Sequence, residues 1–341
     1  MMRRRLAATL LCAGLAAAYC SIASARDVSP ANKPAAKEKA HSKKAGSKEK
    51  APPKEKPEHQ WFGVIGHSFS NRGGEAQLQK SLGKMKDPLL AFVVATGIKA
   101  ASEPCTDALY ERRRDMFEDA KRPVVVLPAA SDWAECKNGA GRPAAIERLN
   151  RLREVLYAGP AALGQHSLPL TRQSASAKFR SYAENAYWVV GNVLYATVNL
   201  PGNNNHYRPE AGRNSEFEDR AVANRFWLKR QFAQARRNEL EGIVLFSEAD
   251  VKILTDEPGL LARFGRGPQP VDGYAAQRRQ IVQLASQYEG KVLLIDTAPV
   301  GNGSEPTIAW RGNLGHASIG ARAVQVQVTP KVEPVFTLEE P

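Results

Sequence analysis

The sequence predicts an α/β fold in which buried sheets are flanked by helices, and three patterns indicate it. Short runs rich in β-branched residues show no polar alternation, which is typical of strands buried on both faces. Longer amphipathic, charged stretches separate these runs and predict helices. Late in the chain, Val324, Val326 and Val328 alternate with Gln325 and Gln327, which predicts a half-buried antiparallel strand. Together these patterns predict an α/β sandwich.

The individual elements follow from the same patterns. The predicted buried strands, in chain order, are Phe62–Ile65, Leu90–Val94, Val124–Leu127, Ile243–Phe246 and Val292–Ile295. The predicted helices are Leu109–Ala120, Ala144–Tyr157, Glu216–Arg237 and Ala275–Tyr288. A hairpin is expected over Tyr187–Tyr195 with its turn at Gly191-Asn192. Since no second linker follows, residues 61–341 are predicted to form one domain.

Large aromatic residues are expected to hold the core of this domain. Trp133, Trp188 and Trp227 are the predicted anchors. In the helix predicted over Glu216–Arg237, Phe226 falls near the expected apolar stripe, whereas Arg220 is expected to point elsewhere.

Residues 1–25 have the pattern of a secretory signal peptide. Arg3–Arg5 form a positive n-region, Leu6–Tyr19 an apolar h-region, and Ala23–Ala25 a small-x-small cleavage site. The alternative is an uncleaved membrane anchor, but a span needs about 20 apolar residues and this run is shorter. We therefore expect a periplasmic or secreted protein, cleaved near Ala25.

Residues 26–60 are predicted to be a disordered linker rich in Lys, Ala and Pro. They contain no aromatic residue and almost no large aliphatic one, so they cannot bury enough surface to offset the entropy of ordering. The formal net charge of +13 falls to +5 once the n-region and this linker are set aside. The linker is either a solubilising spacer or a tether for an anionic surface. No aromatic interleaving accompanies the basic residues, so nucleic acid is not an expected partner.

Two cysteines remain in the mature chain, Cys105 and Cys136. An even number in an oxidising compartment predicts a disulfide between them. A two-cysteine metal site is the competing interpretation, but no flanking CxxC or CxxH motif supports it.

Common catalytic motifs do not occur in this sequence. It has no GxxxxGK[ST] phosphate loop, GxSxG nucleophile elbow, HExxH or GxGxxG motif. A Ser-His-Asp triad is left open, although no serine lies in a recognisable elbow. His166 and His316 are flanked by glycines and are expected in surface loops.

The order of the segments that follow the predicted strands resembles the calcineurin-like metallophosphoesterases, in particular an exported bacterial branch. The matching segments are Phe62–His67, Phe92–Lys99, Pro123–Trp133, Val198–Asn205, Phe246–Asp250 and Leu293–Ala298. The resemblance covers residues 61–300 approximately and implies an αββα sandwich. It also implies two divalent cations, held by Asp, Asn and His at strand ends, that activate a hydroxide for phosphoester hydrolysis.

The expected metal ligands are replaced one after another. The first Asp position is His67, and the bridging carboxylate position is Gly97. Ala130 and Ser131 stand in the turn before Asp132 that should supply the next ligand. In the closing motif, the terminal His position is Ala298. Since these changes remove charge and donor atoms, we expect the paired-metal site to be lost at Gly97, Ala130 and Ala298.

The resemblance and the missing ligands together predict a pseudoenzyme of the phosphoesterase fold that acts by binding an unidentified ligand or envelope partner. We expect no metal cofactor. The residues expected around its vestigial pocket are His67, Ser131, Asp132, Asn204, Asn205, His206, Glu248 and Asp296. The alternative is an active phosphomonoester or phosphodiester hydrolase with one or two divalent ions. A mononuclear version would use His67, Asp132, Glu248 and Asp296.

Overall fold

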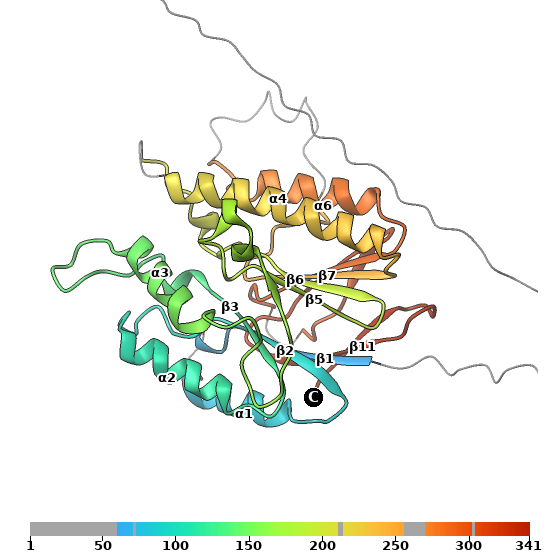
Figure 1. The fold of residues 1–341 in the computed structure, drawn as a ribbon, viewed down its shortest axis with the longest axis horizontal. Coiled ribbons are helices and arrows are strands. Elements are labelled where there is room, and N and C mark those ends of the chain that lie inside the picture. Colours follow the sequence, from blue (N-terminus) through green and yellow to red (C-terminus); the bar gives the residue numbers. More distant parts are fainter. Residues whose placement is uncertain (1–59, 71–72, 211–213, 256–269, 302–303) are drawn as a thin grey trace, which may run out of the picture. The chain divides into compact units, whose positions relative to one another are not determined.

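The structure is a computed structural model that describes residues 60–70, 73–210, 214–255, 270–301 and 304–341 (Figure 1). The predicted signal peptide and the linker up to residue 59 lie outside these ranges. Within them, no helix is both long and apolar enough to cross a membrane. All of the described residues belong to one unit of the chain.

Two mixed β-sheets form the centre of this unit. The five-stranded sheet has, in spatial order, β12 (Phe336–Glu339), β11 (Ala323–Val328), β1 (Gln60–Ile65), β2 (Leu90–Thr96) and β3 (Val124–Leu127). The seven-stranded sheet has β4 (Thr171–Arg172), β5 (Ala186–Val190), β6 (Val193–Thr197), β7 (Gly242–Ser247), β8 (Lys291–Asp296), β10 (Leu314–Ser318) and β9 (Ala309–Arg311). Strands β1, β2 and β3 are parallel, as are β6, β7, β8 and β10.

Helices cover the outer face of each sheet (Figure 1). On the five-stranded sheet they are α1 (Gly74–Lys84), α2 (Asp107–Glu118) and α3 (Ala145–Leu156), and on the seven-stranded sheet α4 (Ser215–Arg237) and α6 (Ala275–Ser286). Short 3-10 helices are η1 (Ser68–Ser70), η2 (Ala130–Asp132), η3 (Gln173–Ala175), η4 (Ala177–Phe179) and η5 (Asn204–His206). The layers run helix, sheet, sheet, helix, which confirms the predicted α/β sandwich class.

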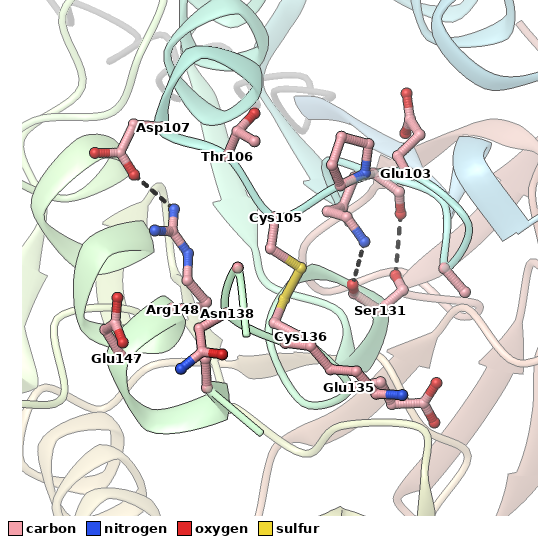
Figure 2. Close-up of a pocket in the computed structure, with 16 residues that line it drawn as sticks. Glu103, Cys105, Thr106, Asp107, Ser131, Glu135, Cys136, Asn138, Glu147 and Arg148 are labelled. Carbon is pink, nitrogen blue, oxygen red and sulfur yellow. Dashed lines mark hydrogen bonds and ion pairs between the residues drawn. A yellow bond between two sulfur atoms is a disulfide. The ribbon is translucent and has the colours of Figure 1, made fainter. Parts of the chain in front are cut away.

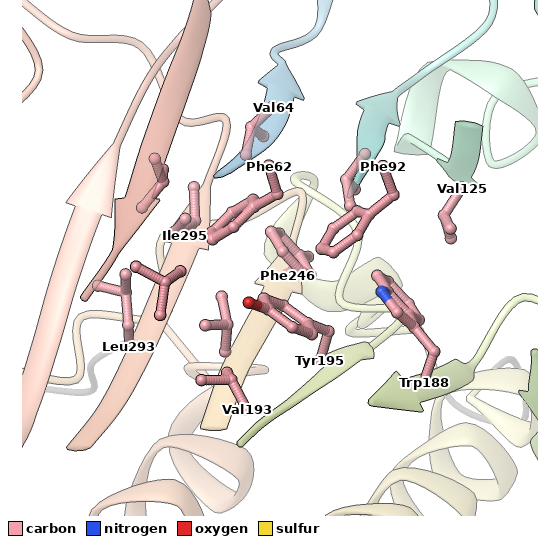
Figure 3. Close-up of a cluster of buried hydrophobic side chains, with 14 of the residues drawn as sticks. Phe62, Val64, Phe92, Val125, Trp188, Val193, Tyr195, Phe246, Leu293 and Ile295 are labelled. Carbon is pink, nitrogen blue, oxygen red and sulfur yellow. The ribbon is translucent and has the colours of Figure 1, made fainter. Parts of the chain in front are cut away.

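An aromatic cluster joins the inner faces of the two sheets (Figure 3). The rings of Phe62 and Phe92, from the five-stranded sheet, stack with their centroids 5.3 Å apart. Tyr195 of the other sheet packs edge-on against Phe92 at 4.7 Å, and Trp188 and Phe246 complete the group. Because each aromatic side chain buries about 150–250 Å² of surface, this cluster provides much of the contact between the sheets.

Most of the predicted elements are confirmed. All five buried strands and all four helices form, with ends that differ from the prediction by a few residues. Strands β5 and β6 form the predicted hairpin, in which Gly191 has a φ of +55° that favours glycine. Strand β11 pairs antiparallel with β1 and β12, as the alternation predicted. The predicted disulfide is also confirmed: Cys105 and Cys136 link the loop after β2 to the loop after β3.

The predicted orientation of helix α4 was wrong at two positions. Phe226, expected in the apolar stripe, is 47% exposed, whereas Arg220 is fully buried. Burial of Arg220 is possible because its guanidinium bonds both carboxylate oxygens of Glu216 and the side-chain and backbone oxygens of Asn205. A charged side chain with this many hydrogen-bond partners can be buried at a position where the helical pattern of the sequence predicts an apolar residue.

Candidate functional site

The predicted site residues follow the carboxyl ends of strands from both sheets. His67 comes after β1, Gly97 directly after β2, and Ser131 lies in η2 after β3. Glu248 follows β7, and its carboxylate Oε2 accepts a hydrogen bond of 2.6 Å from the Ala130 amide on the other sheet. The loops of the two sheets therefore meet at one edge of the sandwich.

Asp132 holds the loops after β2 and β3 together. Its Oδ1 accepts from the amides of Ile98 and Lys99 at 3.0 and 3.1 Å, and its Oδ2 accepts from the Ala129 amide at 2.8 Å. The side chain is fully buried, and this burial raises the pKa of Asp132 above its usual value. Both carboxylate oxygens are thus engaged by the backbone of the chain itself.

Glu248 has a similar role between the loop after β3 and two further loops. Its Oε2 accepts from the amides of Ala130 and Gly202, the latter at 2.7 Å. These bonds join the loops after β3, β6 and β7. Burial raises the pKa of Glu248 to about 8.

His67 occupies the space that a side chain at position 97 would need. A Cβ added to Gly97 would lie 2.2 Å from Cδ2 of His67, and Gly97 has a φ of +74°. The His67 Nε2 lies 3.3 Å from Ser131 Oγ and 3.4 Å from the Lys99 carbonyl oxygen. Burial lowers the pKa of His67, so its imidazole is neutral at pH 7. The position of the His67 ring therefore depends on the absence of a side chain at position 97.

Lys99 is a buried cation that the sequence analysis did not identify. Only 1% of the residue is exposed, and its Nζ donates to the carbonyl oxygens of Ala100 and Ser131, both at 2.7 Å. Burial lowers the pKa of Lys99. Lys99 follows β2 by three residues. No motif in the sequence distinguishes it from a lysine at the surface, so its burial could not be predicted.

The predicted residues of η5 mainly fix the backbone. The Asn204 and Asn205 amides donate to the carbonyl oxygens of Val271 and Gly273, at 3.0 and 2.8 Å. The His206 ring packs against Trp133 with centroids 4.7 Å apart. His206 lines a cavity of about 290 Å³ between the starts of α3 and α4.

Asp296 lies in a different cluster, with His316 and Asp250. The His316 Nε2 lies 2.5 Å from Asp296 Oδ2 and 3.5 Å from Asp250 Oδ1. Burial opposes the charged form of His316, but its hydrogen bond to Asp296 and the charges of both carboxylates raise its pKa. The expectation that His316 lies in a surface loop was wrong: it lies on β10, which pairs with β8 so that Ser318 faces Asp296.

This cluster is the set of side chains best placed to hold a metal ion. Among the described ranges, it is the one group of three or more His, Cys, Asp or Glu residues whose ligand atoms all lie within 4.8 Å of one another. It contains Asp296 from the mononuclear set that the sequence suggested, together with His316 and Asp250 in place of His67, Asp132 and Glu248.

A cavity of about 650 Å³ opens beside Lys99 and Ser131 (Figure 2). It lies between the loops after β2 and β3 and the starts of α2 and α3. The Cys105–Cys136 disulfide lines it, and charged side chains of both signs surround it, including Glu135 and Arg148. Of the pocket residues predicted from the sequence, Ser131 lines this cavity.

Comparison with protein-family models finds none that matches this sequence, and comparison with curated proteins finds no match.

Proposed function

We propose that this is an exported protein of the calcineurin-like phosphoesterase fold that no longer holds the family's metal pair and acts by binding a ligand. One observation carries the proposal: the carboxylates of Asp132 and Glu248 are hydrogen-bonded by backbone amides of the surrounding loops. In this role they stabilise the loops themselves, without a cation to bridge them.

The side chains at this edge of the sandwich do not fit two bridged cations. Gly97, Ala130 and Ala298 provide no side-chain donor at three positions where the family carries ligands. Paired divalent cations need several hard oxygen or nitrogen donors arranged around both ions. Lys99 is buried in the same region, and its amino group, when protonated, repels a cation there and so disfavours metal binding further.

The cavity beside Ser131 is the binding site that best suits this function. Its volume of about 650 Å³ is in the range of small-molecule sites, and its walls combine apolar surface with charges of both signs. These features favour a polar, mixed-charge ligand over a purely apolar one. Export follows from the predicted signal peptide, with the linker as spacer or as tether to an anionic surface.

Phosphoester hydrolysis in the presence of added metals tests the proposal. The protein should be incubated with manganese, zinc or iron and assayed on p-nitrophenyl phosphate and bis-p-nitrophenyl phosphate. We expect no metal-dependent rate above that of Asp132→Asn. A metal-dependent rate that Asp132→Asn or Asp296→Asn abolishes would overturn the proposal.

A second candidate function is a hydrolase with one metal ion at Asp250, Asp296 and His316, and the clustering of their ligand atoms favours it. One imidazole and two carboxylates suit zinc, manganese or iron. Calorimetric titration with each metal tests this candidate. It predicts one ion per chain with a loss of affinity in His316→Gln, whereas no binding, or equal affinity in the variant, contradicts it.

A further inference from the structure

Ser131 and His67 form a pair with the geometry of a nucleophile and its base. Ser131 Oγ lies 3.3 Å from His67 Nε2, close to the distance at which a hydroxyl can pass its proton to an imidazole. Ser131 also lines the cavity of about 650 Å³ described above, which places this residue beside a molecule bound there. Such pairs are commonly somewhat long before substrate binds.

The fold holds the imidazole firmly. His67 is only 7% exposed, and its ring lies against the backbone of Gly97, where any larger residue would displace it. The Nε2 atom also lies 3.4 Å from the Lys99 carbonyl oxygen, so the base role requires the tautomer that carries its proton on Nδ1 and leaves the Nε2 lone pair for Ser131. The position of the ring is therefore set by the strand ends of β1 and β2.

The loop that carries Ser131 is fixed as well. Lys99 Nζ holds the Ser131 carbonyl oxygen at 2.7 Å, and the neighbouring Asp132 is held by three backbone amides. Ser131 Oγ also lies 3.0 Å from the Lys99 carbonyl oxygen. Rotation about the Cβ–Oγ bond is enough to turn the hydroxyl proton from that carbonyl to His67, with no movement of the backbone.

We propose that Ser131 is the nucleophile and His67 the general base of a metal-free acyl transfer on carboxylic esters bound in this cavity. Ser131 Oγ bonds to the ester carbonyl carbon while its proton moves to His67 Nε2. The bond to the leaving oxygen then breaks, and the alcohol departs with that proton. Water, deprotonated by His67, bonds to the acyl carbon; the bond from that carbon to Ser131 Oγ then breaks, the carboxylic acid departs, and His67 returns the proton to the Ser131 oxygen. This activity goes beyond the binding role proposed above and does not depend on it.

Covalent labelling with an alkyl fluorophosphonate tests the proposal without knowledge of the substrate. Attack by Ser131 forms an O–P bond, releases fluoride and passes the hydroxyl proton through His67 to solvent. Mass spectrometry of the folded protein should find one adduct per chain, on the peptide that contains Ser131. Ser131→Ala should abolish it, and His67→Gln should slow it by about 100-fold or more.

Of two further variants, the first separates chemistry from general damage to the fold and the second displaces the base. Ser68→Ala is the matched control, because Ser68 is buried next to His67 and its hydroxyl bonds Gly66; its labelling rate should equal that of the wild type. Gly97→Ala should slow labelling while Ser131 is still present, because the added Cβ displaces the imidazole. No labelling of the folded wild type, labelling that survives Ser131→Ala, or an unchanged rate in His67→Gln would each overturn the proposal.

Discussion

Replacement of Asp132 by alanine distinguishes two roles for its carboxylate. It either stabilises the surrounding loops by hydrogen bonds or belongs to an unoccupied metal site. If the carboxylate belonged to an empty metal site, its removal would relieve repulsion between acidic groups and leave the fold as stable or more stable. In the structure it is the common acceptor for the amides of Ile98, Lys99 and Ala129. Its removal should therefore destabilise the protein even when no metal is present.

The hydrogen bonds set the size of this effect. A hydrogen bond to a charged group contributes about 1.5–3 kcal/mol, and a buried amide left without an acceptor costs about 1–3 kcal/mol. Because the three bonds share one group and water can enter the space left by the side chain, their contributions do not add fully. We expect Asp132→Ala to lower the free energy of unfolding by about 3–5 kcal/mol.

Asp132→Asn should have a smaller effect, of about 1–2 kcal/mol. Its amide oxygen can still accept from Ile98 and Lys99, but its NH₂ group would face the Ala129 amide, which is also a donor. As a control, Asp87→Ala removes an exposed aspartate that accepts one bond, from Leu89, and should cost less than about 1 kcal/mol. Urea unfolding in the presence of EDTA measures all three. Equal or greater stability of Asp132→Ala would refute the reasoning.

Three further predictions concern stability. Replacement of Cys105 and Cys136 by alanine should cost about 3–4 kcal/mol in urea unfolding, because the bond closes a loop with a sequence separation of 31; a loss below about 1 kcal/mol would contradict this. Glu184→Gln should cost about 3 kcal/mol at pH 7, since it removes the negative charge that pairs with the partly buried Arg153 guanidinium. Burial raises the pKa of Glu184, but the Arg153 charge and its hydrogen bonds bring the pKa below its usual value of 4.5. The stabilisation is therefore present above pH 4.5 and lost as the pH falls through the lower folded-state pKa, and the Gln variant should lack this part of the acid transition. Deletion of residues 26–59 should leave the melting temperature unchanged, and a fall of more than a few degrees would show that they pack on the domain.

The sequence predicted secondary structure best where every residue of a strand is buried. The run Val124–Leu127 became β3 with the predicted ends, because four apolar residues between turn signals have few alternatives to a buried strand. The edge strand β9 was not predicted, since its three residues are all exposed and depend on pairing with β10. Helix α1 was also missed: its buried side chains are only Leu78 and Ser81, too few to mark a helical period.

For the candidate site, the sequence indicated which residues follow the strands, but it did not indicate which groups these residues bond. His67, Ser131 and Glu248 were assigned to a common region from the resemblance to the phosphoesterases, and in the structure they follow β1, β3 and β7. Which groups bond to each other depends on three-dimensional contacts between residues far apart in the chain. The bond from Ala130 to Glu248 spans 118 residues, and the approach of His316 to Asp296 depends on the register of β10 on β8. No local pattern encodes such contacts.

The metal content of a protein that comprises residues 26–341 tests most directly whether a metal pair is absent. The protein should be purified without chelator, incubated with manganese, zinc and iron, desalted and measured by elemental analysis. We expect that no metal pair remains bound, since Asp132 and Glu248 are engaged by backbone amides. About one ion per chain, lost in His316→Gln, would favour the single-metal candidate. About two ions per chain would contradict the claim that side chains and backbone amides have replaced the metal pair.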